Sequence, residues 1–100
     1  MGHILENVVY LELARRGGEI YVGKMGDAEI DFVVIKGEYK EYYQVSLSVR
    51  DENTMKRELA PLQAIQDHYP KYLLTMDNDP EVLHDGIRQI YVLDWLVKGY

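Results

Sequence analysis

Two carboxylates stand two residues apart at the start of a short apolar run, Glu29 and Asp31. Side chains two positions apart on a strand share a face, so both would point the same way. Mg²⁺ prefers oxygen ligands, and metal-assisted hydrolysis of a phosphodiester also needs a positive group near the attacking water. If the chain performs such chemistry, Asp31 can supply an oxygen anion, whereas Glu29 is a turn residue and is more typical of a solvated side chain.

Other kinds of catalytic site find little support in the sequence. There is no cysteine, which excludes disulfides, thiolate zinc sites and cysteine nucleophiles. Gly23-Lys24-Met25-Gly26 lacks the spacing of a phosphate-binding loop and predicts a hairpin turn. Ser46 and Ser48 have no histidine near them in sequence that could act as a base. The histidines are too far apart for helical pairing and are typical of surface residues: His3, His68 and His84.

The composition favours one acidic domain over residues 1–100. Seventeen acidic residues against eleven basic ones give a net charge of −6. This charge disfavours nucleic acid as a partner unless the basic residues gather on one face or a metal intervenes. The apolar runs are shorter than the roughly 18 residues of a membrane span, and the first residues lack the features of a signal peptide. We therefore expect a cytoplasmic location and no membrane partner.

The apolar pattern predicts eight helices and strands along the chain. In the second helix, Pro61 is expected to cause a kink or a restart, because proline lacks the backbone donor. Short glycine-marked turns predict that the first three strands form an antiparallel meander. The order α-β-β-β-α-β-β-α predicts an α/β (α+β) fold, a mixed sheet flanked by helices. Helices are expected at Ile4–Ala14, Asp51–Tyr69 and Asp94–Lys98, and strands at Glu19–Lys24, Ile30–Ile35, Glu41–Val49, Lys71–Met76 and Arg88–Val92.

The order of elements resembles the core of the restriction-endonuclease-like superfamily. Its PD-(D/E)xK pattern has an Asp on the second strand, a D/E-x-K triplet on the third and often an acid on the first helix. The resemblance places Asp31, Gln44-Val45-Ser46 and Glu6 at these positions. Gln44 is a neutral amide where a carboxylate is expected, and Ser46 a neutral hydroxyl where an ammonium is expected. The resemblance therefore implies a vestigial nuclease site.

A catalytic ammonium could still come from elsewhere in the chain. Some members of the superfamily relocate this lysine, and the candidates here are Lys56 near the start of the second helix and Lys24 at the end of the first strand. Glu29 could in the same way replace the missing carboxylate beside Asp31.

Glu12 falls inside the apolar arc of the first helix, between Leu5 and Val8 on the helical wheel. Burying a lone carboxylate is costly, so Glu12 needs a partner. Two interpretations stay open. Glu12 pairs with Arg16 one turn later, or it faces the same cavity as Glu6.

Several segments together resemble the C-terminal domain of unknown function that is attached to bacterial and archaeal AAA-type ATPases. The resemblance rests on GHILENVVYLEL at the start, the E-I-D-F block at Glu29 to Phe32, the Q-V-S triplet, and Tyr69-Pro70-Lys71-Tyr72. It implies a nuclease-like fold, often degenerate, that follows an ATPase module and a winged-helix region. Since this chain has no phosphate-binding loop, we expect an excised domain or a stand-alone relative, with an ATPase module as its partner in cis or in trans.

The sequence leads to one functional prediction with two alternatives. The leading prediction is a non-catalytic, nuclease-like accessory or interaction domain without a cofactor. The first alternative is a nuclease dependent on Mg²⁺ or Mn²⁺ that uses Asp31 with Glu6, Glu29 or Glu12 and a relocated Lys56. The second is a homodimerising module that binds through exposed tyrosines and an open sheet edge.

Overall fold

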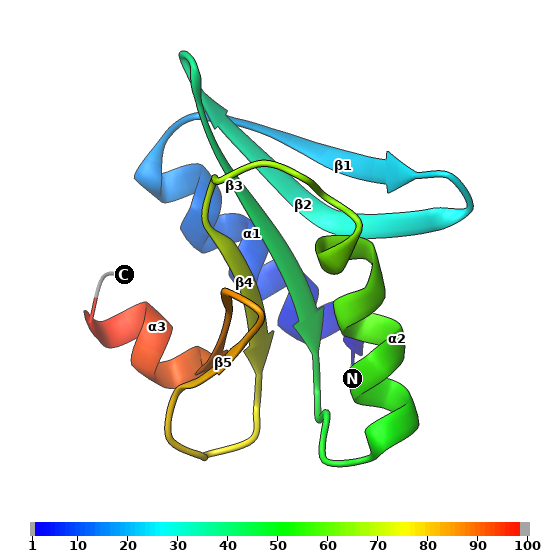
Figure 1. Ribbon diagram of the computed structural model, residues 1–100. Coiled ribbons are helices and arrows are strands. Elements are labelled where there is room, and N and C mark those ends of the chain that lie inside the picture. The colour runs from blue at the N-terminus through cyan, green and yellow to red at the C-terminus, as the bar shows by residue number, and fades with distance from the viewer. Residues whose placement is uncertain (1, 99–100) are drawn as a thin grey trace.

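The computed structural model describes residues 2–98, which form a six-stranded mixed sheet flanked by helices (Figure 1). Every predicted helix and strand is present in the predicted order, so the α/β fold class is confirmed. Within residues 2–98, no helix is both long and apolar enough to cross a membrane. The elements are α1 (Gly2–Arg16), β1 (Glu19–Met25), β2 (Ala28–Lys36), β3 (Tyr39–Ser46), α2 (Glu52–Gln63), β4 (Lys71–Thr75), β5 (Val82–His84), β6 (Ile87–Tyr91) and α3 (Val92–Lys98).

The strands lie in the order β1-β2-β3-β4-β6-β5. β1, β2 and β3 form the predicted antiparallel meander. β3, β4 and β6 run parallel, with α2 as the crossover between β3 and β4. In a parallel pair the carboxyl ends lie at the same edge of the sheet, and Ser46 of β3 is indeed the partner of Thr75 of β4.

α2 is shorter than the predicted helix over residues 51–69, because it ends at Gln63. Pro61 lies in its last turn, and no helix restarts beyond it. In the following segment, Asp67 accepts a hydrogen bond from the N–H of Tyr69 at 3.0 Å, a local turn that competes with helix. Tyr69 also precedes a proline, which disfavours the helical conformation. The apolar spacing therefore continues for about two turns after the helix has ended.

The short strand β5 was not predicted. It forms a hairpin with β6 through Asp85 and Gly86, whose φ angles are 52° and 86°. Two successive residues with positive φ are the requirement of a two-residue type I′ turn, and Asp-Gly is a preferred sequence for it. The sequence thus contained the signal for the turn. A strand of three residues, however, is too short to show the alternation of apolar and polar residues that predicts a strand.

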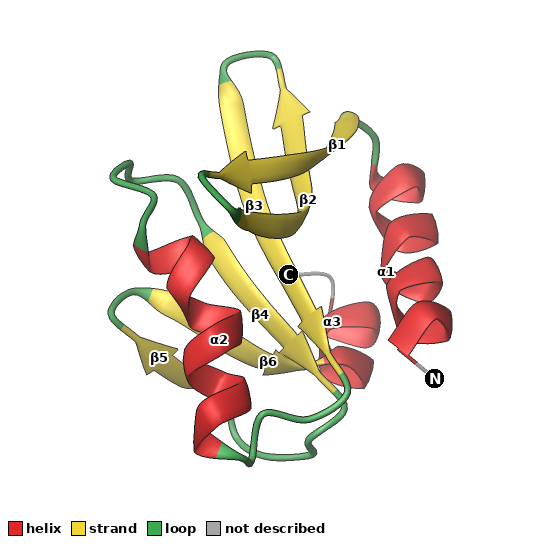
Figure 2. Ribbon diagram, turned by 90° about the vertical axis from the view of Figure 1, so that its right-hand side faces the viewer, coloured by secondary structure: helices red, strands yellow, loops and turns green. Residues whose placement is uncertain are grey.

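Two apolar layers lie on opposite faces of the sheet (Figure 2). α1 and α3 cover one face, and α2 covers the other. Alternation along β3 sends Tyr42 to the α2 face and Tyr43 to the α1/α3 face. The α1/α3 layer buries Leu5, Val9, Leu13, Val34, Tyr43, Val45, Tyr72, Leu74, Ile90, Val92 and Trp95. The α2 layer buries Ile30, Tyr42, Val49, Leu59, Leu62, Leu73 and Ile87.

β2 contains an irregularity that bends it away from β3. In the pairing of β1 with β2, Tyr21 lies opposite Val33 but Gly23 lies opposite Ile30, so β2 has one more residue than β1 across this step. An extra residue of this kind bends the strand and increases its twist, as in a β-bulge. The first half of β2 therefore continues beside β1 after its pairing with β3 has ended.

Gly23→Ala is expected to destabilise the fold by about 1–3 kcal/mol, because the new methyl group overpacks the bend. A Cβ at this position would lie 2.7 Å from Cγ2 of Val33 and 3.2 Å from Cβ of Ile30. Urea unfolding followed by circular dichroism measures the change. Lys24→Ala, at the neighbouring exposed position, is the control and should stay within about 0.5 kcal/mol of the wild type. Equal stability of Gly23→Ala and Lys24→Ala would contradict a tightly packed bend.

Candidate functional site

Asp31 lies where β2 leaves β3, and reciprocal hydrogen bonds connect the two strands there. The N–H of Asp31 donates to Oε1 of Gln44 at 2.8 Å, and the N–H of Val45 donates to Oδ2 of Asp31 at 2.8 Å. Gln44 is 3% exposed, and its Nε2 donates to the carbonyl oxygen of Glu58 at 3.1 Å. Two of the predicted site residues therefore replace the backbone ladder and tie β2, β3 and α2 together.

Neighbouring acids act on the carboxylates of Asp31 and Glu58. Burial is the main cause that raises the pKa of Asp31; a backbone N–H of β3 opposes this effect, and the charges of Glu6 and Glu29 add to it. Burial also raises the pKa of Glu58, with a further contribution from the charge of Asp31, while the charge of Arg57 opposes it and that of Glu6 adds to it. The predicted acids Glu6 and Glu29 thus lie within electrostatic range of Asp31.

Glu58 is the acid that the sequence reasoning missed. It lies on α2, three residues after Met55 and four before Leu62, which both belong to the α2 layer. Residues at these offsets lie on one side of a helix, so Glu58 is turned toward the sheet. This spacing was the available signal, but an isolated Glu in an amphipathic helix is usually solvated, and only the sheet beneath it shows that it lies near Asp31.

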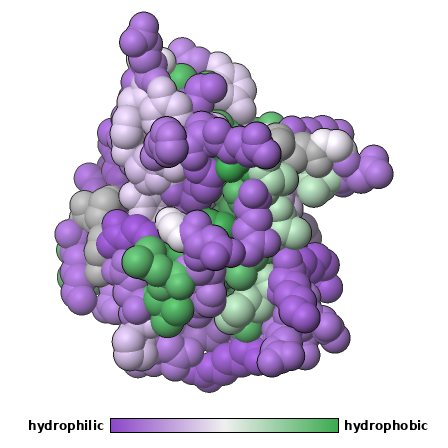
Figure 3. Space-filling model, in the orientation of Figure 1, coloured by the Kyte–Doolittle hydropathy of each residue, from purple (hydrophilic) through white to green (hydrophobic). Residues whose placement is uncertain are grey.

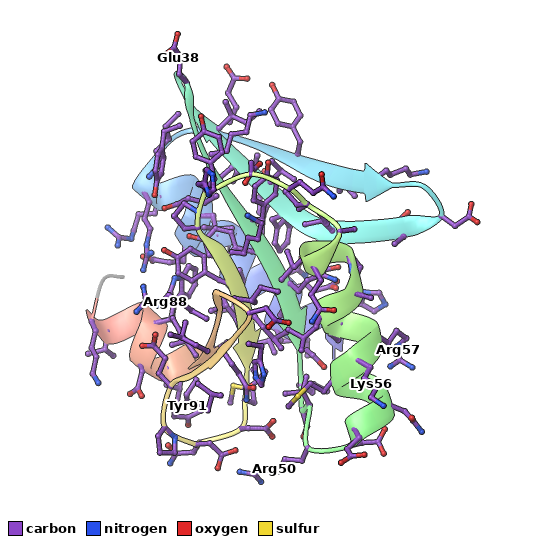
Figure 4. All side chains as sticks on the ribbon, viewed as in Figure 1. Glu38, Arg50, Lys56, Arg57, Arg88 and Tyr91 are labelled. Atoms are coloured by element: carbon purple, nitrogen blue, oxygen red, sulfur yellow. The ribbon has the colours of Figure 1, made fainter. Side chains whose placement is uncertain are left out.

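None of the residues predicted as possible sources of a catalytic ammonium acts on Asp31 in the structure. Ser46 donates from Oγ to the carbonyl oxygen of Ser48 at 3.1 Å, within the turn that follows β3. Lys24 and Lys56 are exposed, and Figure 4 shows Lys56 beside Arg57 on the outer side of α2. Neither lysine is among the charges that shift the pKa of Asp31.

Glu12 is held by two arginines of its own helix. Arg15 donates to it at 2.9 and 2.7 Å, and Arg16 at 2.7 Å. These bonds, that of Arg15 first, lower the pKa of Glu12 to about 2 against the opposing effect of burial. Arg16 in turn donates to the carbonyl oxygen of Trp95 at 3.0 Å and stacks 4.3 Å from the centre of its ring. The structure therefore favours the ion-pair interpretation, and Arg16, held by Glu12, joins α1 to α3.

The acids around Asp31 do not form a ligand set in this conformation. Within residues 2–98, no three His, Cys, Asp or Glu side chains are arranged so that they could hold a metal ion. The histidines are also dispersed: Nδ1 of His3 lies 3.9 Å from Glu6, and Nε2 of His84 lies 2.7 Å from Oε1 of Gln89. Any cation bound by these acids would require their side chains to rearrange.

A cavity of about 510 Å³ lies at the amino ends of β4 and β6, and Lys71 and Asp67 in its lining are paired with each other. Nζ of Lys71 donates to the carbonyl oxygen of Asp67 at 2.9 Å, to its Oδ1 at 2.9 Å and to the carbonyl oxygen of Tyr69 at 3.0 Å. Tyr42 donates to Oδ2 of Asp67 at 2.6 Å, and burial followed by this bond raises the pKa of Tyr42 to about 12. All three donors of the ammonium are used, so this network stabilises the turn before β4.

Two longer proteins are similar to the chain. An uncharacterized protein of Haemophilus influenzae is 43% identical over 94 residues, which are 94% of this chain and 23% of that protein. An uncharacterized protein of Methanocaldococcus jannaschii is 39% identical over 70 residues, which are 66% of this chain and 16% of that protein. The chain thus spans less than a quarter of the length of these curated relatives. No known protein family matches the chain, and no solved structure matches it.

Asp31→Ala and Asp31→Asn should differ in their effect on stability. Alanine removes the acceptor of the Val45 N–H, and a buried donor without a partner costs about 1–3 kcal/mol. Asparagine keeps an oxygen acceptor and removes the charge that Glu6 and Glu29 repel. We expect Asp31→Ala to be clearly destabilised at pH 7, and Asp31→Asn to be at least as stable as the wild type.

The pH dependence gives a second readout of the same pair of variants. The pKa of Asp31 is higher in the folded protein than in the unfolded chain, where it is near 4. The protonated Asp31 side chain therefore contributes fully to stability below about pH 4, and this contribution is lost as the pH rises through the pKa of the folded protein. The free energy of unfolding of Asp31→Asn, relative to the wild type, should therefore increase between pH 4 and pH 7. A constant difference over this range would show that the carboxylate is not strained by its acidic neighbours.

Proposed function

We propose that this chain is a non-catalytic, nuclease-like accessory domain whose role is interaction. The observation that carries the proposal is the structural use of Asp31 and Gln44. One oxygen of Asp31 accepts the N–H of Val45, and both ends of the Gln44 amide are bonded to the backbone of other elements. These side chains are fixed by the fold at the positions where the family resemblance expects catalytic groups.

The charges around these residues support the same proposal. Metal-dependent hydrolysis of a phosphodiester needs ligand oxygens and a positive group that stabilises the developing charge. The charges that act on Asp31 are the acids Glu6 and Glu29, while Ser46 is neutral and bonded to a backbone carbonyl. The acids around Asp31 disfavour the approach of a phosphate group.

The longer relatives support a role within a larger assembly, since this chain corresponds to 23% and 16% of their lengths. The resemblance to the C-terminal domain of AAA-type ATPases suggests the partner, an ATPase module in cis or in trans. The absence of cysteine agrees with a cytoplasmic location for this assembly.

A metal-dependent nuclease is the second candidate function. It is favoured by the neighbouring acids, since Glu6 and Glu29 raise the pKa of Asp31, and Asp31 and Glu6 raise that of Glu58. A divalent cation would relieve this repulsion. In that case Mg²⁺ or Mn²⁺ would be held after a rearrangement of these side chains, and Lys56 or Arg57 would have to turn inward from the outside of α2.

Cleavage assays test the leading proposal. The chain, incubated with Mg²⁺ or Mn²⁺ and with single- and double-stranded DNA and RNA, is expected to cleave no faster than Asp31→Asn, because the charges that act on Asp31 are those of acids. Products are measured on denaturing gels. Cleavage by the wild type that Asp31→Asn loses would overturn the non-catalytic role.

Titration with Mn²⁺ alone, followed by isothermal calorimetry, separates the two candidates further. The nuclease candidate requires binding that is lost in both Asp31→Asn and Glu58→Gln, whereas the accessory domain should show the same weak response in all variants. Glu52→Gln, which removes an exposed acid from the first turn of α2, is the matched control for the loss of one charge.

A further inference from the structure

An apolar groove runs between α1 and α3 on the face of the sheet opposite α2. It encloses about 250 Å³, and its walls come from both helices, while Leu47 and Met76, which directly follow β3 and β4, complete the lining. Figure 2 shows the two helices side by side on this face. The lining of this α1/α3 groove consists of Ile4, Leu5, Val8, Leu47, Met76, Val92, Leu93 and Leu96.

The apolar surface continues from the groove along both helices. On α1, Ile4, Val8 and Leu11 follow the spacing i, i+4, i+7 and form one ridge; Ile4 is 65% exposed and Leu11 66%. On α3, Val97 is 85% exposed and lies one turn after Leu93. Together these side chains offer roughly 600 Å², the upper end of the largest apolar patch on a typical monomer.

The opposite side of the molecule looks different. In Figure 3 hydrophilic side chains cover most of the visible face, and a hydrophobic area lies over β5, where Val82 and Leu83 are exposed. The outer edge of β1 is also open, but Glu19 and Lys24 place charges near its ends and its partner β2 is bulged. Charges and bulges at an edge discourage strand pairing, so the sheet edge is a weaker docking surface than the groove.

Opposite charges lie together beside the groove, although the whole chain carries −6. Asp94 and Lys98 have opposite signs on α3, and Arg15 on α1 is bonded to Glu12. Two copies of an acidic protein repel each other, and these oppositely charged pairs reduce the repulsion at this face. It is therefore a face on which a second copy can approach.

We infer that the α1/α3 groove binds a second copy of this chain, with the Ile4–Val8–Leu11 ridge of each copy seated in the groove of the other. The contact is self-complementary, because each copy carries both a ridge and the groove beside it, as a two-fold interface requires. Two patches of this size bury about 1,200 Å², the lower limit for a specific interface, so the dimer forms reversibly and depends on concentration. The inference rests on the interaction role proposed above and gives that role a partner and a surface.

Sedimentation equilibrium of the 100-residue chain over micromolar to millimolar concentrations tests the inference. The wild type should dimerise, and Leu11→Glu should weaken the dimer more than tenfold because it buries a charge in the apolar contact. Leu83→Glu is the matched control: Leu83 is exposed to the same extent, 66%, but lies on β5 outside the groove. It should dimerise like the wild type.

Several outcomes of these measurements would overturn the inference of a dimer. A wild type that stays monomeric at millimolar concentration overturns the inference, and so does a dimer that Leu11→Glu leaves intact or that both variants weaken equally. Val97→Glu, on α3, must also weaken the dimer, and circular dichroism checks that these exposed substitutions leave the fold unchanged. A monomeric result leaves the proposed accessory role standing, whereas nuclease activity lost in Asp31→Asn would overturn that role without affecting the dimer.

Discussion

The pair of hydrogen bonds between Asp31 and the Gln44–Val45 segment holds the structure together at its most irregular point. β2 leaves β3 there, and its bend lets the end of the β1–β2 hairpin project away from β3 (Figure 1). A bend in the middle of a sheet leaves backbone groups without ladder partners, at a cost of about 1–3 kcal/mol for each buried group. Because Gln44 also bonds to the carbonyl oxygen of Glu58, the same interaction fixes how α2 sits on the sheet.

This arrangement sets two requirements on Asp31 that oppose each other. Its oxygen must accept the N–H of Val45, which favours the charged form, while burial and the charges of Glu6 and Glu29 disfavour it. Burial is the larger effect, so the carboxylate is kept at a cost. Glu58 is destabilised in its charged form as well, because burial and neighbouring acids also raise its pKa. An acidic group in such surroundings persists either because it binds a cation or because its geometry is needed, and the bond to Val45 is the need that the structure displays.

The elements could be predicted from the sequence wherever local pattern and tertiary packing agree, as for β1 to β4 and α1. Predictions failed where the two diverge. The apolar spacing predicted a helix that continues beyond Gln63, where α2 ends. The hydrogen bond of Asp67 and the steric effect of Pro70 on Tyr69 instead favour a non-helical segment there. At the site, Glu58 could not be predicted from the sequence, because its proximity to Asp31 depends on how α2 crosses the sheet. The structural use of Gln44 was equally hidden, since a bulge in β2 decides which backbone groups need a partner.

Alternation along β3 keeps the two surfaces of interest apart, since Gln44 faces α2 while Tyr43 and Val45 belong to the α1/α3 layer. α1 touches both surfaces, and so does β3, whose end is followed by the groove residue Leu47. On its helical wheel Glu6 lies on one flank and Val8 on the other, with the buried Val9 between them. A partner in the groove would therefore contact one flank of α1 while the other flank still faces Asp31. The two surfaces have α1 and β3 in common but no side chain, so any coupling between them has to be carried by a displacement of these elements.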